Sequence, residues 1–363
     1  MELRLLHFIL TSCILIIGTF TSIAQNFNYV SGSYTPGFLL AHRADIKNLA
    51  AHNYGFEVAY ELDRTNTSWG SHYQKPSIGY GFLYYNLGKE ETGHAFGGQA
   101  HVKLNVLKLG SSDLRFRAGA GLAYLTQKFD VETNRRNQAI GSHLNGSMQF
   151  GLIAHIPVRS NKDYMECGIS ISHYSNAAFK VPNLGYNIPS FTLRYGLGVK
   201  SNSSSKAGTV KEEDETKKHD WRVTAIYGKK QRNFANPLNF YNKGIQFRGL
   251  RNVSATKAWR FGLDYTLDKS YKYAEDFTFP LSDVTIADQS EVAIAGGFQW
   301  SFGKVGVAAE IGTYLYKPGI LKNPLNQRMG LIYTVDKHWS AQGMLRFHRG
   351  VADFFEMGIG YTL

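Results

Sequence analysis

Cysteine is nearly absent from this 363-residue chain, and no long apolar run follows its first two dozen residues. The two cysteines are Cys13 and Cys167, and Cys13 lies inside the apolar N-terminal stretch. A chain processed at its N-terminus would therefore keep one cysteine and could form no internal disulfide. No later segment has enough consecutive apolar residues for a transmembrane helix. These two absences argue against a disulfide-stapled domain and against a helical membrane protein.

The N-terminus has the pattern of a secretory signal. Arg4 lies in a short n-region, residues 5–20 are apolar, and Ser22-Ile23-Ala24 forms a small-residue cleavage pattern. We expect residues 1–24 to be a signal peptide. A membrane anchor is the alternative, but its apolar core would be short.

The charge of the chain is strongly basic, +12 formally. Removal of the signal leaves this balance unchanged, because Glu2 and Arg4 depart together. Export makes nucleic acid an improbable partner. The phosphates of lipopolysaccharide and other anionic outer-membrane lipids are the expected counter-charge.

Apolar residues alternate with polar or small ones along much of the chain, which predicts β-strands. The clearest alternations lie in residues 56–62, 78–84, 114–124, 191–199, 259–267, 305–311 and 355–363. An exported chain of this kind fits an antiparallel outer-membrane β-barrel, in which only one face of each strand need be apolar. A secreted β-sandwich, with its apolar face inward, is the alternative.

The pattern divides the chain into two all-β halves. About eight strands fall between residues 33 and 200, which predicts a small barrel over residues 25–200. Residues 201–219 are polar and charged and predict a linker. Residues 220–363 predict a second barrel-like domain, and a single larger barrel remains the alternative.

The second half has features of a distant, degenerate repeat of the first. His348-Arg349-Gly350 aligns with His173-Tyr174-Ser175 late in each half, and the second copy lacks the hydroxyl. Its last residues resemble the C-terminal assembly signal of outer-membrane barrels.

Acidic residues on the second face of the strands predict a polar barrel interior. Glu57, Glu61 and Glu166 are expected to point inward and to pair with Arg115 or Arg117.

The strand that ends near Ser175 carries the residues most indicative of chemistry. Cys167, Ile169, Ile171, His173 and Ser175 share one face, which in a membrane barrel meets lipid. A base beside a hydroxyl can hydrolyse an ester if other groups orient the base and stabilise the oxyanion. The alternative is a polar strand end at the lipid headgroups, where such residues are ordinary.

The surrounding residues resemble a known family. His173-Tyr174-Ser175-Asn176-Ala177, followed by Pro182-Asn183-Leu184-Gly185, is similar to the active-site segment of the PagL-like lipid A 3-O-deacylases, the acyloxyacyl hydrolase family. The resemblance covers roughly residues 33–200 and includes segments 121–125 and 134–142. It implies an eight-stranded outer-membrane barrel that removes the acyl chain from the 3 position of lipid A without a metal or other cofactor.

The resemblance also implies roles for individual residues. Ser175 would be the nucleophile and His173 the general base, while Asn176 and Asn183 would stabilise the oxyanion or position a loop. Asn187 stands where the family has a glutamate. An amide can orient the imidazole but cannot neutralise an imidazolium, so either Asn187 orients His173 or the site has weakened.

Two other histidines, His42 and His52, show no partner at metal-ligand spacing and are expected to be interfacial. The sequence thus predicts a serine esterase acting on lipid A in the outer membrane of a Gram-negative bacterium. An outer-membrane phospholipase, or a non-catalytic structural or transport barrel, are the alternatives.

Overall fold

The computed structural model describes residues 27–363 except 160–161, 201–218, 234–237, 274–279 and 319–323. The predicted signal peptide and nearly all of the predicted linker lie outside these described residues. Among the described residues, no helix is both long enough and apolar enough to cross a membrane.

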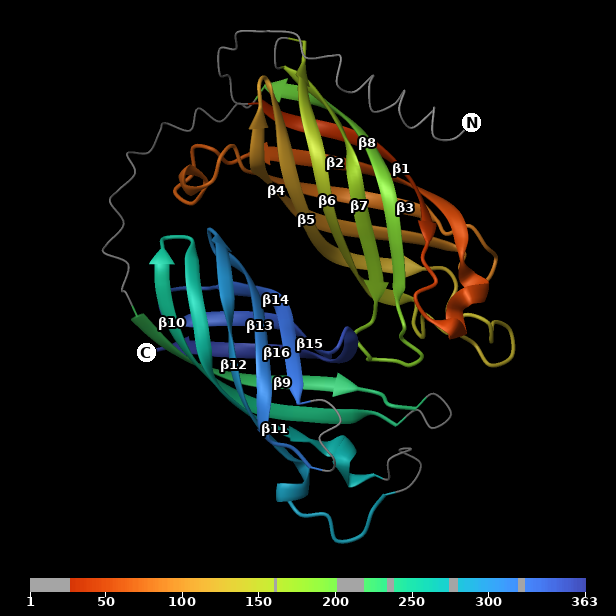
Figure 1. The fold of residues 1–363 in the computed structure, drawn as a ribbon, viewed down its shortest axis with the longest axis vertical. Helices are drawn as coiled ribbons and strands as arrows, with labels where there is room; N and C mark the ends of the chain where they lie inside the picture. The colour runs from red at the N-terminus through yellow and green to blue at the C-terminus, as the bar shows by residue number, and fades with distance from the viewer. Residues whose placement is uncertain (1–26, 160–161, 201–218, 234–237, 274–279, 319–323) are drawn as a thin grey trace.

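Sixteen strands form two closed antiparallel barrels (Figure 1). The eight strands of the first barrel are β1 (Phe27–Leu39), β2 (Ala51–Asp63), β3 (Ser77–Asn86), β4 (His94–Leu109), β5 (Ser112–Leu125), β6 (Leu144–Val158), β7 (Asp163–Ser175) and β8 (Tyr186–Lys200). Those of the second are β9 (His219–Lys230), β10 (Phe240–Ser254), β11 (Lys257–Asp268), β12 (Ser290–Phe302), β13 (Val305–Tyr316), β14 (Leu325–Thr334), β15 (Trp339–His348) and β16 (Val351–Thr362).

Each barrel closes on itself, because β8 pairs with β1 and β16 pairs with β9. The prediction of an all-β, eight-stranded barrel followed by a second barrel is confirmed, and the single larger barrel is wrong. In the described parts of the connections lie four short 3-10 helices: η1 (Ala44–Leu49), η2 (Gly70–His72), η3 (Lys269–Lys272) and η4 (Ala287–Gln289).

The outer faces of both barrels are apolar. Ile169 is 65% exposed and Val58 62%, and in the second barrel Ile359 is 64% exposed. Aromatic residues also contact one another on these faces, as in the group Tyr34, Tyr54 and Phe56. An apolar outer surface that includes aromatic residues is typical of membrane barrels. A soluble sandwich instead buries its apolar faces between its two sheets.

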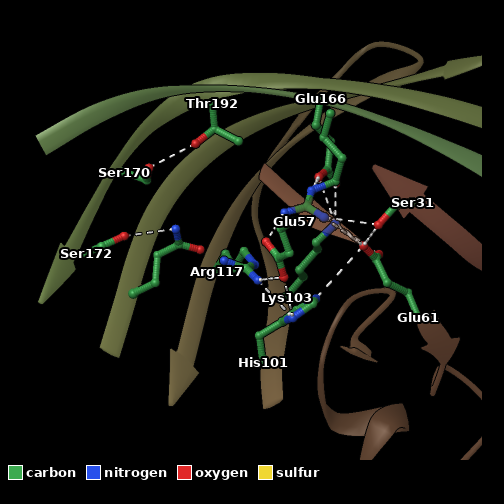
Figure 2. Close-up of polar contacts among 12 residues, drawn as sticks. Ser31, Glu57, Glu61, His101, Lys103, Arg117, Glu166, Ser170, Ser172 and Thr192 are labelled. Carbon is green, nitrogen blue, oxygen red and sulfur yellow. Dashed lines mark hydrogen bonds and ion pairs between the residues drawn. The ribbon is translucent and has the colours of Figure 1, made fainter. Parts of the chain in front are cut away.

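The interior of the first barrel is a network of buried charges (Figure 2). Lys103 Nζ lies 2.9 Å from a Glu61 oxygen and 2.7 Å from a Glu166 oxygen. Arg117 and Arg194 contact the two oxygens of Glu57 at 2.6 and 2.7 Å. The prediction of inward glutamates is correct. Of the two predicted partners, Arg117 pairs with a glutamate, whereas Arg115 contacts Asp113, its neighbour on the same face of β5.

Apolar side chains close one end of this interior, at the rim where β7 ends. They come from strand ends and connections and include Leu39, Ile46, Leu49, Leu87, Leu125, Ile140, Tyr174, Tyr186 and Ile188. We call this end the site rim and the other end the opposite rim. The apolar cluster packs the connections of the site rim against the barrel wall.

Replacing Lys103 with methionine should destabilise the first barrel by about 3–5 kcal/mol, because Glu61 and Glu166 would stay buried without their shared cation. The measurement is the temperature at which the folded band is lost on a heat-modifiability gel. Lys108→Met, at an exposed position on β4, is the matched control. Equal losses in the two variants would contradict the importance of the buried network.

Candidate active site

Strands β7 and β8 bring three of the predicted site residues together. His173 pairs directly with Asn187 in the antiparallel ladder, and Ser175 lies two residues further along β7. All three follow the outer face on which Ile169 and Ile171 are exposed. The predicted base, hydroxyl and amide therefore sit on one patch of the outer wall, at the site rim.

Two tyrosines explain why these side chains point outward. Tyr174 lies between His173 and Ser175, Tyr186 precedes Asn187, and both tyrosines are fully buried inside the barrel. Because neighbouring residues on a strand face opposite sides, burial of the tyrosines holds the polar residues on the lipid side. The Tyr186 hydroxyl also donates to Asn137 Oδ1 at 2.9 Å.

The His173 imidazole bridges the other two groups. Its Nδ1 lies 2.7 Å from Asn187 Oδ1, and its Nε2 lies 3.0 Å from Ser175 Oγ. The amide oxygen can only accept, so Nδ1 carries the proton and Nε2 is free to take one from the hydroxyl. This is the tautomer that a general base for serine requires.

Glycine at position 185 leaves room for the imidazole. Gly185 has φ +77°, and a Cβ there would stand 2.8 Å from His173 Cε1. A side chain at this position would be strained and would displace the ring.

His42 extends the arrangement, and this residue was missed in the sequence. The Asn187 amide nitrogen lies 3.1 Å from His42 Nδ1, a contact that the prediction of an interfacial His42 did not include. The contact joins residues far apart in the chain through the pairing of β1 with β8. Local sequence carried no signal for it.

Asn176 and Asn183 organise the connection from β7 to β8. The Asn176 side-chain amide donates to Ser142 Oγ at 2.8 Å and to the Lys180 carbonyl at 2.9 Å. The Asn176 backbone N–H donates to Asn183 Oδ1 at 2.9 Å. These contacts favour loop positioning over oxyanion stabilisation for both asparagines.

Two backbone N–H groups shortly after the serine have no hydrogen-bond acceptor among the described residues and so are candidates to receive an oxyanion. Ala177 and Ala178 have φ of 55° and 62°, a conformation unusual for residues with a side chain. Within the described part of the chain, neither N–H donates a hydrogen bond. Strained backbone next to a reactive side chain is a recurring feature of functional sites.

The second barrel contacts this same connection. Gln231, which follows β9, donates its backbone N–H to the Ala178 carbonyl at 2.8 Å, and its Oε1 accepts from the Val181 N–H at 3.3 Å. At the opposite rim, Trp69 and Tyr73 of the first barrel pack on Phe302 of the second. The barrels therefore lie side by side and touch at both rims (Figure 1).

The proposed repeat of the site differs in geometry. His348 ends β15, the seventh strand of the second barrel, as His173 ends β7. The side chain of His348, however, shares the inner face with the buried Arg346, and its Nε2 contacts the Tyr314 hydroxyl at 2.8 Å. Gly350 stands where the hydroxyl would be. Among the described residues, no group of three or more His, Cys, Asp or Glu is placed to hold a metal.

Two family models match the chain. Residues 54–196 match the model of lipid A 3-O-deacylase (PagL), and residues 219–363 match that of the acyloxyacyl hydrolase C-terminal domain. The first half of the chain is thus similar to the lipid A 3-O-deacylases of the PagL family, and the second half is similar to the acyloxyacyl hydrolase C-terminal domain. Both descriptions are those of hydrolases that act on acyl esters, and the second extends the resemblance to the half of the chain where the sequence had shown none.

Solved structures show weaker likenesses to the chain. A crystal structure of the outer membrane enzyme PagL shares 19% identity, with 47% of this chain and 99% of that one covered, at a TM-score of 0.32. A Rhodopseudomonas blastica porin mutant shares 7% identity over 93% of this chain and 100% of its own, at a TM-score of 0.18. No curated protein matches the chain. The family likeness rests on the two models.

A fluorophosphonate probe should label Ser175, because the adjacent imidazole activates its hydroxyl. Labelling should fall to background in Ser175→Ala and at least about tenfold in His173→Ala, as measured by intact-protein mass spectrometry. Ser170→Ala, on the inner face of the same strand, is the control and should label normally. Labelling that persists in Ser175→Ala would place the reactive hydroxyl elsewhere.

Proposed function

We propose that this protein is an outer-membrane esterase that removes the ester-linked acyl chain at the 3 position of lipid A, with Ser175 as nucleophile and His173 as base. The observation that carries the proposal is the 3.0 Å contact between His173 Nε2 and Ser175 Oγ on the lipid-facing wall of a PagL-like barrel. An esterase whose substrate is a membrane lipid needs its nucleophile at the boundary between hydrocarbon and water.

The reaction proceeds through an acyl-enzyme. His173 takes the Ser175 proton as Oγ attacks the acyl carbonyl carbon, and the N–H groups of Ala177 and Ala178 donate to the oxyanion. Collapse of the tetrahedral intermediate breaks the bond between the acyl carbon and the sugar oxygen. The sugar oxygen leaves with the proton from His173. Water, deprotonated by His173, then attacks the acyl-enzyme and releases a fatty acid.

In this mechanism Asn187 orients the His173 imidazole but does not neutralise the positive charge that the imidazole gains. Its oxygen accepts from Nδ1 and its nitrogen faces His42, so the amide is anchored on both sides. A neutral orienter of this kind is also found in Cys-His-Asn enzymes.

Loop lengths support placing the site rim outside the cell. Most connections at the opposite rim are short, as at residues 110–111, 255–256 and 303–304, with 64–76 as an exception. Most connections at the site rim are long, such as 126–143 and 269–289, with the two-residue turn at 349–350 as an exception. Short turns in bacterial membrane barrels face the periplasm and long loops face outward. The outer leaflet, where lipid A resides, then lies beside Ser175. A cleaved signal over residues 1–24 would supply the export that this location needs.

Mass spectrometry of lipid A from cells that express the protein should show loss of one hydroxyacyl chain. Ser175→Ala should lower the rate about 10⁴-fold or more, because the nucleophile is removed, while the barrel still folds on a heat-modifiability gel. Fatty acid release from phospholipid vesicles in place of lipid A would instead indicate a phospholipase. No change in either lipid with a folded barrel would indicate a non-catalytic role.

The orienting role of Asn187 predicts opposite effects for two replacements. Asn187→Ala should lower kcat by about 10²- to 10⁴-fold, because the imidazole loses its hydrogen-bond partner. Asn187→Glu should raise kcat about tenfold, because a carboxylate can stabilise the imidazolium. Single-turnover deacylation in detergent micelles measures both. A lower kcat in Asn187→Glu would show that the amide is the adapted group.

A further inference from the structure

A pocket of about 430 Å³ lies at the site rim between the two barrels. The first barrel contributes Arg43, from the connection between β1 and β2. The second contributes Arg232, which follows β9, and His348, Arg349 and Asp353 from the turn between β15 and β16. Six of the seven lining residues belong to the second barrel, and Arg43 belongs to the first.

The pocket is positively charged. Its one acidic residue, Asp353, is buried and contacts Lys230 at 3.1 Å and Arg346 and Arg232 at 2.7 Å each. The two buried cations, Lys230 and Arg346, also pair with Asp268 and Glu291 deeper in the barrel. Arg43 and Arg349 are exposed, and neither forms an ion pair with any residue in the described ranges. Three guanidinium groups thus line the pocket over a single, already paired carboxylate.

Backbone geometry holds two of the arginines in place. Arg349 and Gly350 have φ of 49° and 80° and join β15 to β16 as a two-residue turn of the type that suits tight hairpins. Arg43 directly precedes the helix η1, whose Ile46 and Leu49 are buried in the apolar cluster of the site rim. The backbone at both arginines is therefore fixed by the surrounding fold.

The pocket adjoins the candidate active site at two points. Arg43 follows His42, which contacts Asn187. Arg232 follows Gln231, which holds the connection after Ser175 through Ala178 and Val181. Each of these arginines is therefore the chain neighbour of a residue that contacts the candidate site or the connection after Ser175.

We propose that this pocket binds a phosphate group on the headgroup of the glycolipid whose ester is cut at Ser175. The proposal rests on the proposed function and adds to it a phosphate-binding site completed by the second barrel. Guanidinium groups pair with phosphate oxygens through two parallel hydrogen bonds, which fixes both position and orientation. A phosphate held here would position the sugar so that one ester meets the serine.

Binding can be tested without turnover in the full-length Ser175→Ala protein. Phosphorylated lipid A in detergent micelles should bind about tenfold tighter than the same lipid after phosphatase treatment. Adding Arg43→Gln and Arg349→Gln should remove this difference. Adding Lys47→Gln and Arg135→Gln instead removes two exposed charges of the site rim that do not line the pocket, and should preserve it.

A comparison with inorganic phosphate distinguishes the two possible ligands, a lipid headgroup phosphate and free phosphate. Phosphorylated lipid A that binds at least about tenfold tighter than inorganic phosphate assigns the pocket to the headgroup, whereas equal affinities would overturn that assignment in favour of free phosphate. The proposal would also be overturned if Lys47→Gln with Arg135→Gln weakened lipid binding as much as the two pocket substitutions. It would be overturned again if the Ser175→Ala protein bound phosphorylated and dephosphorylated lipid A equally well. Because turnover is absent, these outcomes are independent of whether the protein proves to be a deacylase.

In the enzyme that keeps Ser175, steady-state kinetics distinguish a loss of phosphate binding from a folding defect. The arginine pair should raise KM for phosphorylated lipid A about tenfold with kcat unchanged, because it removes binding shared by ground and transition states. KM for the dephosphorylated lipid should not change. A fall in kcat for both lipids would indicate a structural effect and contradict the proposal.

Discussion

The candidate site depends on the alternation of side chains across the wall of a closed barrel. Tyr174 and Tyr186 are buried in the interior, so their neighbours His173, Ser175 and Asn187 must face lipid. The β7–β8 register then sets His173 opposite Asn187. A slip of one residue would turn every one of these groups to the other face. The buried tyrosines therefore determine where chemistry can occur.

The second barrel packs directly against the first. It contacts the first barrel at both rims, through Gln231 at one and Phe302 at the other. These two contacts, at opposite ends of the strands, hold the barrels side by side. A barrel that would otherwise be a separate domain can thereby hold the connection after Ser175 and line the adjoining pocket.

Asn187 changes the balance of charge at the site relative to the glutamate of the family. The amide fixes the imidazole tautomer, but it leaves any positive charge on His173 unneutralised. His42 adds a hydrogen-bond partner for the amide nitrogen and so defines which end of Asn187 faces the base. The resulting chain of contacts runs from His42 through Asn187 and His173 to Ser175.

Local pattern alone was enough to predict the eight-stranded barrel and the shared face of His173 and Ser175, because period-two alternation is written in neighbouring residues. Closure into two barrels, the approach of His42 to Asn187, and the pairing of Arg115 with Asp113 rather than with the glutamates were decided by tertiary structure. So was the pocket between Arg43 and Arg349. Such contacts join distant segments, and their geometry depends on strand register, tilt and the packing of one barrel against the other, none of which a short stretch of sequence encodes.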